Sequence, residues 1–257
     1  MRKIILVTTG LICTVASLAP ATATVVPIVT YNQVSSGSTL RWVRAPSGTG
    51  GQLFTIASSN STTPGSATVN FGFLQPVLAA LGPLAAKLTL TASSTQAAVP
   101  VAGFLTQQSM TGQFAFTYTG AAPLTVGFTT YNTGANLLSG SFTNGVIVGA
   151  TGGTAGFFSA STGGGSAISM ASDFIDFVAS TKFDLSVGLN ALSSPFGQSN
   201  AQSALNSFRA AGNGSFGADA PGITATIPEP ASWALMVGGF GALGATMRRR
   251  RLRRVAA

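Results

Sequence analysis

The chain has 257 residues, of which 46% are hydrophobic and only 7% charged, and its formal net charge is +8. It contains no histidine and a single cysteine, Cys13. This composition excludes Ser-His-Asp and Cys-His catalytic sites and zinc sites built on histidine. The net charge alone would favour nucleic acid or anionic lipid as a partner, so the positions of the charges have to be considered.

The first segment has the pattern of a secretory signal peptide. Two basic residues precede an apolar run over 4–18, and Ala21-Thr22-Ala23 follows with small residues at the cleavage spacing. We predict a signal helix in residues 1–23, translocation by the Sec machinery and removal by signal peptidase after Ala23. Cleavage after Ala21 is the alternative. The only cysteine lies in the apolar run and leaves with it.

Residues 24–227 form the predicted exported body. It retains five basic and four acidic residues, a net charge of +1, so nucleic acid is not expected as a partner. It contains no cysteine, and its stability must therefore come from packing rather than from disulfides. The charged residues of the body are Arg41, Arg44, Lys87, Lys182, Arg209, Asp173, Asp176, Asp184 and Asp219.

The sequence of the body predicts a mainly β structure. Short stretches rich in β-branched and aromatic residues are broken by glycine or asparagine about every ten positions, a pattern typical of an antiparallel β-sandwich or a jelly-roll-like fold. The clearest expected strands are 68–74, 87–92, 112–119, 124–131, 139–143, 156–159, 167–178, 182–189 and 214–218.

Two features refine this prediction. Phe114, Phe116 and Tyr118 alternate with small residues, so we expect them on one face, towards the core. Residues 75–86 are apolar, but Pro76 and Pro83 limit them to one helical turn or a loop.

A second candidate helix covers residues 199–211. Ala201, Ala204, Leu205 and Phe208 recur at helical spacing, and Gly212 follows as a stop signal. A strand through 205–209 is the alternative.

The acidic residues offer a weak candidate metal site. Asp173 and Asp176, with Asp184 further on, supply oxygen ligands that would suit calcium. No D-x-D-x-D-G loop is present, and two aspartates three apart in a strand point to opposite faces, which disfavours a paired-carboxylate glycosidase. We therefore expect no resident metal, and aspartates that accept hydrogen bonds from turn N–H groups.

Two further patterns bear on ligand binding. Trp42 stands close to Arg41 and Arg44 and could stack on a sugar ring if exposed, although a tryptophan in this setting is more often part of the core. The Thr-x-Thr spacing of Thr89 and Thr91 is the kind found on ice-binding faces, but the sequence lacks regular ranks of it on successive strands.

The last thirty residues form a sorting signal in this interpretation. Residues 231–247 carry no charge and would reach roughly 25 Å as a helix, a thin transmembrane segment. An arginine-rich block, 248–257, follows and should stay on the cytoplasmic side, so the body lies outside. Its arginines are Arg248, Arg249, Arg250, Arg251, Arg253 and Arg254.

The tail resembles a known family signal. Residues 228–234 read Pro228-Glu229-Pro230-Ala231-Ser232-Trp233-Ala234, which matches the five fixed positions of the PEPxxWA variant of the PEP-CTERM sorting signal. The resemblance covers residues 228–257. It implies export in a Gram-negative bacterium that makes exopolysaccharide, and processing near the motif by a membrane-embedded exosortase. Pro228, Glu229, Pro230, Trp233 and Ala234 would be its recognition residues.

These patterns together predict an exported, non-enzymatic protein without a cofactor. Its precursor is anchored in the inner membrane and its processed form is released to the cell surface or extracellular matrix. The body is expected to be structural or adhesive, with exopolysaccharide as a candidate partner. The alternative is a secreted carbohydrate-binding module, with or without calcium.

Overall fold

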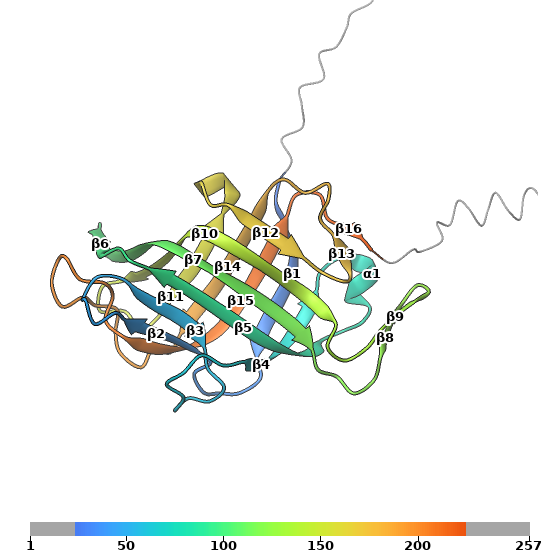
Figure 1. Ribbon diagram of the computed structural model, residues 1–257, viewed down its shortest axis with the longest axis horizontal. Helices are drawn as coiled ribbons and strands as arrows, with labels where there is room; N and C mark the ends of the chain where they lie inside the picture. Colours follow the sequence, from blue (N-terminus) through green and yellow to red (C-terminus); the bar gives the residue numbers. More distant parts are fainter. Residues whose placement is uncertain (1–23, 225–257) are drawn as a thin grey trace, which may run out of the picture.

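The computed structural model describes residues 24–224, which are almost entirely strands and their connections (Figure 1). A single helical turn, α1 (Pro76–Ala79), and a 3-10 turn, η1 (Thr162–Gly164), are the helical elements of this part of the chain. The strands are β1 (Val26–Gln33), β2 (Leu40–Arg44), β3 (Gly51–Thr55), β4 (Ala67–Phe73), β5 (Leu84–Ser94), β6 (Ala98–Val101), β7 (Phe104–Tyr118), β8 (Leu124–Val126), β9 (Thr129–Tyr131), β10 (Asn136–Ala150), β11 (Gly156–Ser161), β12 (Ile168–Ala171), β13 (Ile175–Asp176), β14 (Phe183–Asn190), β15 (Phe208–Ala218) and β16 (Gly222–Ile223).

Twelve of these strands form one antiparallel sheet, which confirms the mainly β, antiparallel expectation. The sheet closes on itself: β1 pairs with β4, then β5, β7, β10, β11, β14 and β15 follow, and β15 pairs again with β1. Closure leaves fewer unpaired strand edges than an open sheet of the same size would.

At two places in this ring, one long strand pairs with two shorter strands along different parts of its length. β15 pairs with β2 through Phe208–Ala210 and with β1 through residues 213–218. On the far side, β5 pairs with β4 through residues 84–88 and with β3 through residues 91–94. The remaining pairs form two small separate two-stranded sheets, the hairpin β8–β9 and the long-range pair β13–β16.

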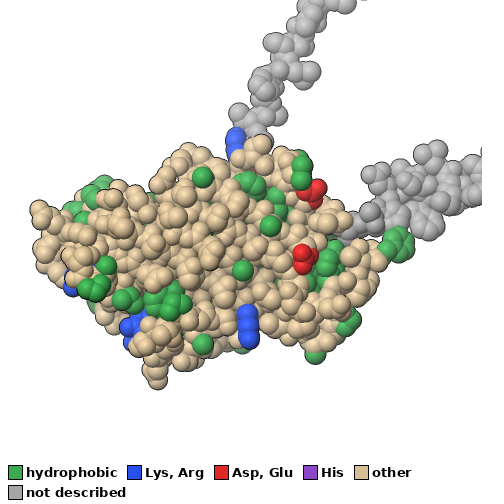
Figure 2. Space-filling view, viewed as in Figure 1, with side chains coloured by type: hydrophobic (Ala, Val, Ile, Leu, Met, Phe, Trp, Pro, Cys, Tyr) green, Lys and Arg blue, Asp and Glu red, His purple; other side chains and the backbone are tan. Residues whose placement is uncertain are grey.

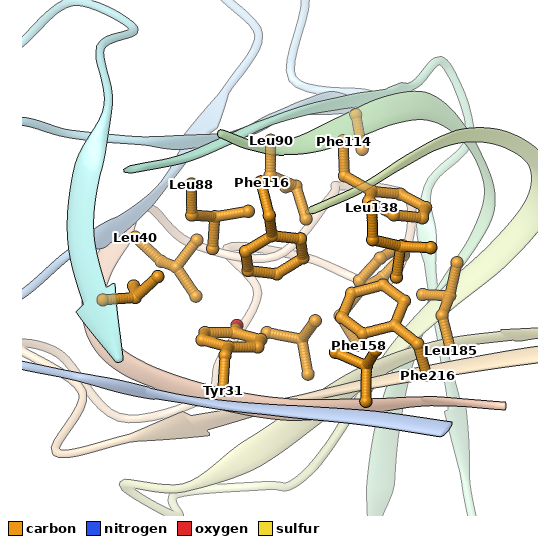
Figure 3. Close-up of a cluster of buried hydrophobic side chains, with 14 of the residues drawn as sticks. Tyr31, Leu40, Leu88, Leu90, Phe114, Phe116, Leu138, Phe158, Leu185 and Phe216 are labelled. Carbon is orange, nitrogen blue, oxygen red and sulfur yellow. The ribbon is translucent and has the colours of Figure 1, made fainter. Parts of the chain in front are cut away.

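The interior of the ring is filled by side chains from two facing walls, as in a sandwich (Figure 3). Tyr31 of β1 contacts Phe116 of β7 with ring centroids 5.1 Å apart, and Phe114 of β7 contacts Phe216 of β15 at 4.7 Å. In Figure 1, β5 and β7 cross in front of β1 and β15. The predicted inward face of β7 is confirmed, because Phe114, Phe116 and Tyr118 are all buried.

The region around α1 follows its prolines. Pro76 lies in the first turn of the helix, where its missing N–H costs nothing, and the turn ends at Ala79 before Gly82 adopts φ +70°. The expectation of one helical turn is confirmed. Residues 84–86, which were expected to lie in the helical turn or loop of residues 75–86, instead belong to β5.

The helix expected over 199–211 is wrong. The Ser203 hydroxyl accepts the N–H groups of Ser199 and Asn200, while Leu205 N–H donates to the side chain of Gln107. Strand β15 then begins at Phe208, and Gly212 continues it rather than ending a helix. Local hydrogen bonds and pairing with β2 thus outweigh the helical spacing.

Two other expected strands are divided. The stretch 124–131 is a hairpin, because Gly127 adopts φ +60° between β8 and β9. The stretch 167–178 contains β12 and the short β13, separated by a turn at residues 172–174. Among residues 24–224, no helix is long and apolar enough to cross a membrane.

Candidate ligand-binding face

Four neighbouring strands, β5, β7, β10 and β12, present small neutral side chains on the outside of the ring, opposite the core. We call this surface the hydroxyl face. It consists of Thr89, Thr91, Thr111, Gln113, Ala115, Thr117, Ser139, Ser141, Thr143, Ser169 and Ala171. The strand period of two explains it, since each of these residues alternates with a buried one such as Leu90, Phe114 or Phe142.

The register of the four strands aligns these side chains in rows that cross the sheet. One row runs through Thr91, Gln113, Ser141 and Ser169. The next runs through Thr89, Ala115, Ser139 and Ala171. Because paired strands lie about 4.8 Å apart, each row is a ladder of evenly spaced polar or methyl groups.

Together, the two rows line a shallow hollow of about 570 Å³. Ala115 and Ala171 have short side chains at its floor, while the longer Gln113 and the hydroxyl of Ser169 are exposed beside them. The hydroxyls of Ser141 and Ser169 lie 2.8 Å apart and share one hydrogen bond, which fixes their orientation. Neither row carries a charged side chain, although the exposed Lys87 of β5 pairs with Thr117 one row beyond Thr89. Figure 2 shows a broad surface with few charged groups on this side of the molecule.

The close approach of the strands beneath the face depends on two glycines. A Cβ at Gly112 would lie 2.1 Å from the carbonyl oxygen of Thr91, and one at Gly140 would lie 2.2 Å from that of Ser169. Larger residues at these positions would push β5 from β7 and β12 from β10. The close strand spacing beneath the hydroxyl face therefore requires glycine at these two positions.

The candidate metal ligands Asp173, Asp176 and Asp184 do not form a cluster. Asp173 accepts the N–H of Asn136 at 2.7 Å, and Asp176 accepts the N–H of Val178 at 2.9 Å. Asp184 lies on β14, in the opposite wall. Within residues 24–224 there is no group of three or more His, Cys, Asp or Glu side chains that could hold a metal ion.

Asp184 has a different environment from the other two. Its outward-facing side chain borders a second hollow, of about 350 Å³, with Ser161, Ser186 and Ser215. One carboxylate oxygen, Oδ1, is buried and has no hydrogen-bond partner among the described residues. Asp173 and Asp176 thus serve as acceptors for loop N–H groups, whereas Asp184 contributes the single acidic group of this hollow.

Trp42 is fully buried, and its indole N–H donates to the carbonyl oxygen of Leu205 at 3.0 Å. The possibility that it stacks on a sugar ring is therefore wrong, and its place in the core is confirmed. The nearby Arg41 and Arg44 point to polar partners instead, with Arg41 donating to the carbonyl oxygen of Ser61 and Arg44 to Ser199 and Asn206.

Sequence reasoning found only part of the hydroxyl face. The Thr89–Thr91 spacing was visible, but the serines of β10 and β12 were not linked to it. The alternation could have revealed them, since Ser139, Ser141 and Thr143 follow one another at period two and buried Phe142 lies between the last two. What the sequence could not supply was the register that brings β12 beside β10.

The predicted signal cleavage site at Ala21 and Ala23, the motif 228–234, the segment 231–247 and the arginine block 248–257 lie outside the described residues. Comparison of the chain with protein-family models, with curated proteins and with solved structures found no match.

Proposed function

We propose that this chain is an exported, non-enzymatic protein of the cell surface or extracellular matrix, whose body adheres to neutral polysaccharide through the hydroxyl face. The observation that carries the proposal is the pair of in-register rows of Thr, Gln and Ser on four adjacent strands. Such a surface offers many weak hydrogen bonds to the hydroxyl groups of an extended glycan, and none of them requires a charged partner.

The chemistry of the face favours neutral over acidic glycans. Hydroxyl and amide groups both donate and accept hydrogen bonds, as sugar hydroxyls do. A uronate or sulfate would require Arg or Lys for strong charge-assisted contacts; neither row contains one, and the cation beside the face is Lys87, which pairs with Thr117. Individual contacts of this kind contribute about 1 kcal/mol or less, so affinity depends on many contacts along the chain.

The terminal segments support export and processing. The signal-peptide pattern of residues 1–23, the resemblance of residues 228–257 to the PEP-CTERM signal and the arginines 248–254 agree on one topology. In this proposal an exosortase recognises the motif around Pro228 and Pro230, and the inner-membrane precursor is converted to a surface or matrix form. The absence of histidine anywhere in the sequence supports a non-enzymatic role.

Affinity electrophoresis through gels containing one neutral or one acidic polysaccharide tests the binding proposal. The full chain should be retarded by at least one neutral polysaccharide and less by acidic ones. Gln113→Glu together with Ser141→Asp should remove most of that retardation, because each carboxylate disturbs the centre of the hollow. Ser186→Asp, on the opposite wall, is the matched control and should migrate like the unaltered protein in the neutral gels.

Equal retardation of the double variant and the unaltered chain would show that the hydroxyl face is not the binding surface. The export proposal has its own test. Fractionation of cells, followed by mass spectrometry of the C-terminus, should find the body outside the inner membrane and ending near residue 228. A body that stays full length in the inner membrane would contradict it, whatever the outcome in the gels.

A further inference from the structure

The second hollow, which Asp184 borders, contains a carboxylate oxygen with no partner. Asp184 Oδ1 is buried and accepts no hydrogen bond within residues 24–224. Asp173, Asp176 and Asp219, in contrast, each accept hydrogen bonds from backbone N–H groups. A buried polar atom normally has a partner, and a buried carboxylate oxygen without one destabilises the fold. Asp184 therefore lacks a donor, and a cationic donor would form the strongest hydrogen bond with it.

The strand register places the beginning of the body close to this aspartate. Asp184 of β14 pairs with Gly217 of β15, and Gly217 pairs with Pro27 of β1, so the three strands lie side by side (Figure 1). Directly paired residues project to the same face of a sheet, which here is the outer face. Because adjacent strands are about 4.8 Å apart, the backbone of Pro27 lies about 10 Å from that of Asp184.

The residues before Pro27 come closer still. A Cβ added to Gly217 would lie 2.7 Å from Cγ1 of Val25 and 3.0 Å from the carbonyl oxygen of Val26. Val25 also lines the hollow together with Asp184. Since Gly217 has no side chain, the chain can pass directly over β15 at this point. The first residues of the body thus enter the hollow of Asp184.

The predicted removal of the signal peptide supplies a cation at this place. Hydrolysis of the bond between Ala23 and Thr24 by one water molecule leaves a carboxylate on Ala23 and an α-ammonium group on Thr24, which is mostly protonated near neutral pH. Before cleavage the same nitrogen is an uncharged amide. Thr24 directly precedes Val25, and two residues of chain span about 7 Å at most, so this nitrogen stays within reach of the hollow that Val25 lines.

Two other charged groups lie near the same ends of these strands. The carboxylate of Asp219, just after β15, already accepts three hydrogen bonds from Thr181 and Lys182. Lys182 precedes Asp184 by two residues and is a competing cation. The carboxylate with an unsatisfied buried oxygen is Asp184, and this favours it over Asp219 as the partner of a new ammonium group.

We propose that the α-ammonium group of Thr24, created by signal-peptide cleavage, binds in this hollow and forms an ion pair with Asp184. The inference rests on the export part of the proposed function, because it requires cleavage after Ala23. Strand β1 pairs with both β15 and β4 and so closes the ring. An ion pair at Asp184 links the start of this closing strand to β14 as well, and the processed body gains a contact that the precursor lacks.

Acetylation of the α-amine measures this ion pair in the exported chain. The full chain is expressed with its signal peptide, its N-terminus is identified by mass spectrometry, and the folded protein is treated with succinimidyl acetate near neutral pH. Only the unprotonated amine reacts, so pairing with Asp184 slows acetylation of Thr24. Asp184→Asn should speed it about 3- to 10-fold relative to acetylation of Lys87 on β5, the internal reference. Denaturation in urea should abolish the difference.

The matched control is Asp176→Asn, which removes the same charge from β13, outside the sheet of β14, β15 and β1. It should change the Thr24 rate by less than about 2-fold, because solvent and salt screen a distant exposed charge. Circular dichroism checks that each variant is folded. An unchanged Thr24 rate in folded Asp184→Asn protein would overturn the proposal, and faster acetylation of Lys182 in its place would assign that lysine as the partner.

An effect of Asp219→Asn as large as that of Asp184→Asn would also overturn the ion pair, by assigning the ammonium group to the other carboxylate. These results leave the export proposal intact. A chain that begins at Thr22, or one that keeps residues 1–23, would overturn the inference through the predicted cleavage instead. The mass of the N-terminal peptide separates the two kinds of failure, and neither depends on glycan binding.

Discussion

The indole N–H of Trp42 donates a hydrogen bond to the carbonyl oxygen of Leu205 at 3.0 Å, across 163 residues of sequence. The bond ties β2 to the segment that leads into β15, and Trp42 pairs with Phe208 just beyond it. It satisfies the one polar atom of a fully buried side chain and one buried carbonyl together. This long-range contact between a side chain and the backbone adds to the strand pairing of β2 with β15 at this position of the closed sheet.

Replacing Trp42 by Phe should lower the free energy of unfolding by about 2–4 kcal/mol. The change leaves the Leu205 carbonyl unpaired and a cavity where the second ring was. Urea denaturation followed by circular dichroism measures the effect, and Val34→Ala, at an exposed position, should change stability by less than about 0.5 kcal/mol. Glycan retardation of the folded Trp42→Phe protein should be unchanged. Reduced retardation without loss of stability would instead favour a direct role of Trp42 in binding.

Gly149→Ala should destabilise the protein by about 1–3 kcal/mol, because the new Cβ would lie 2.3 Å from the ring of Phe196. Phe196 is buried at this end of the ring and also contacts Phe208, so it has little room to move. The double variant Gly149→Ala, Phe196→Leu should be less destabilised than the sum of its parts, which thermal unfolding can measure. Gly163→Ala, with 3.5 Å to its nearest neighbour, is the control. Additive effects in the double variant would exclude a direct clash.

Tyr31→Phe should raise the free energy of unfolding by about 1 kcal/mol. The Tyr31 hydroxyl is buried without a hydrogen-bond partner among residues 24–224, and its burial raises the pKa of the phenol. The ring contacts with Phe116 and Phe216 are kept. Tyr118→Phe is the matched comparison, since that hydroxyl donates to the Ala122 carbonyl at 2.7 Å and its loss should destabilise the protein. Equal destabilisation of both variants in urea would show that Tyr31 has a polar partner.

The loop held by Asp219 should open in acid. Partial desolvation acts to raise the pKa of Asp219, but hydrogen bonds from Lys182 N–H and from the N–H and hydroxyl of Thr181 outweigh it and lower the pKa below its ordinary value of 3.8. A lowered pKa in the folded state stabilises the fold above the unfolded pKa, and this contribution is lost as the pH falls through the folded pKa.

Hydrogen exchange of the Thr181 and Lys182 amides measures this opening. Protection should be constant from neutral pH to about pH 4 and should fall below that, once the intrinsic exchange rate is accounted for. Asp219→Asn should be less protected at neutral pH and should lose the acid-dependent step. Retention of the step in Asp219→Asn would assign it to another carboxylate.

Much of the strand content was readable from local pattern. The alternation in β7 was enough to orient Phe114, Phe116 and Tyr118, because period two is a property of the backbone itself. Local pattern did not predict the N-terminal strands, and β2 shows why. In β2, the sequence Leu-Arg-Trp-Val-Arg mixes charge with apolar residues, and only its pairing with β3 and β15 makes Leu40 and Trp42 core residues.

The sequence by itself determined the class of the body, its near-neutral charge, its lack of histidine and cysteine, and the prediction of an exported chain with a sorting tail. These properties follow from composition and from local periodicity, which need no knowledge of partners. Only the tertiary structure decided that the sheet closes, that residues 199–211 form a loop and strand rather than a helix, and which outward residues become neighbours. Register between strands distant in sequence is fixed by the packing of the whole core, and this register assembles the hydroxyl face.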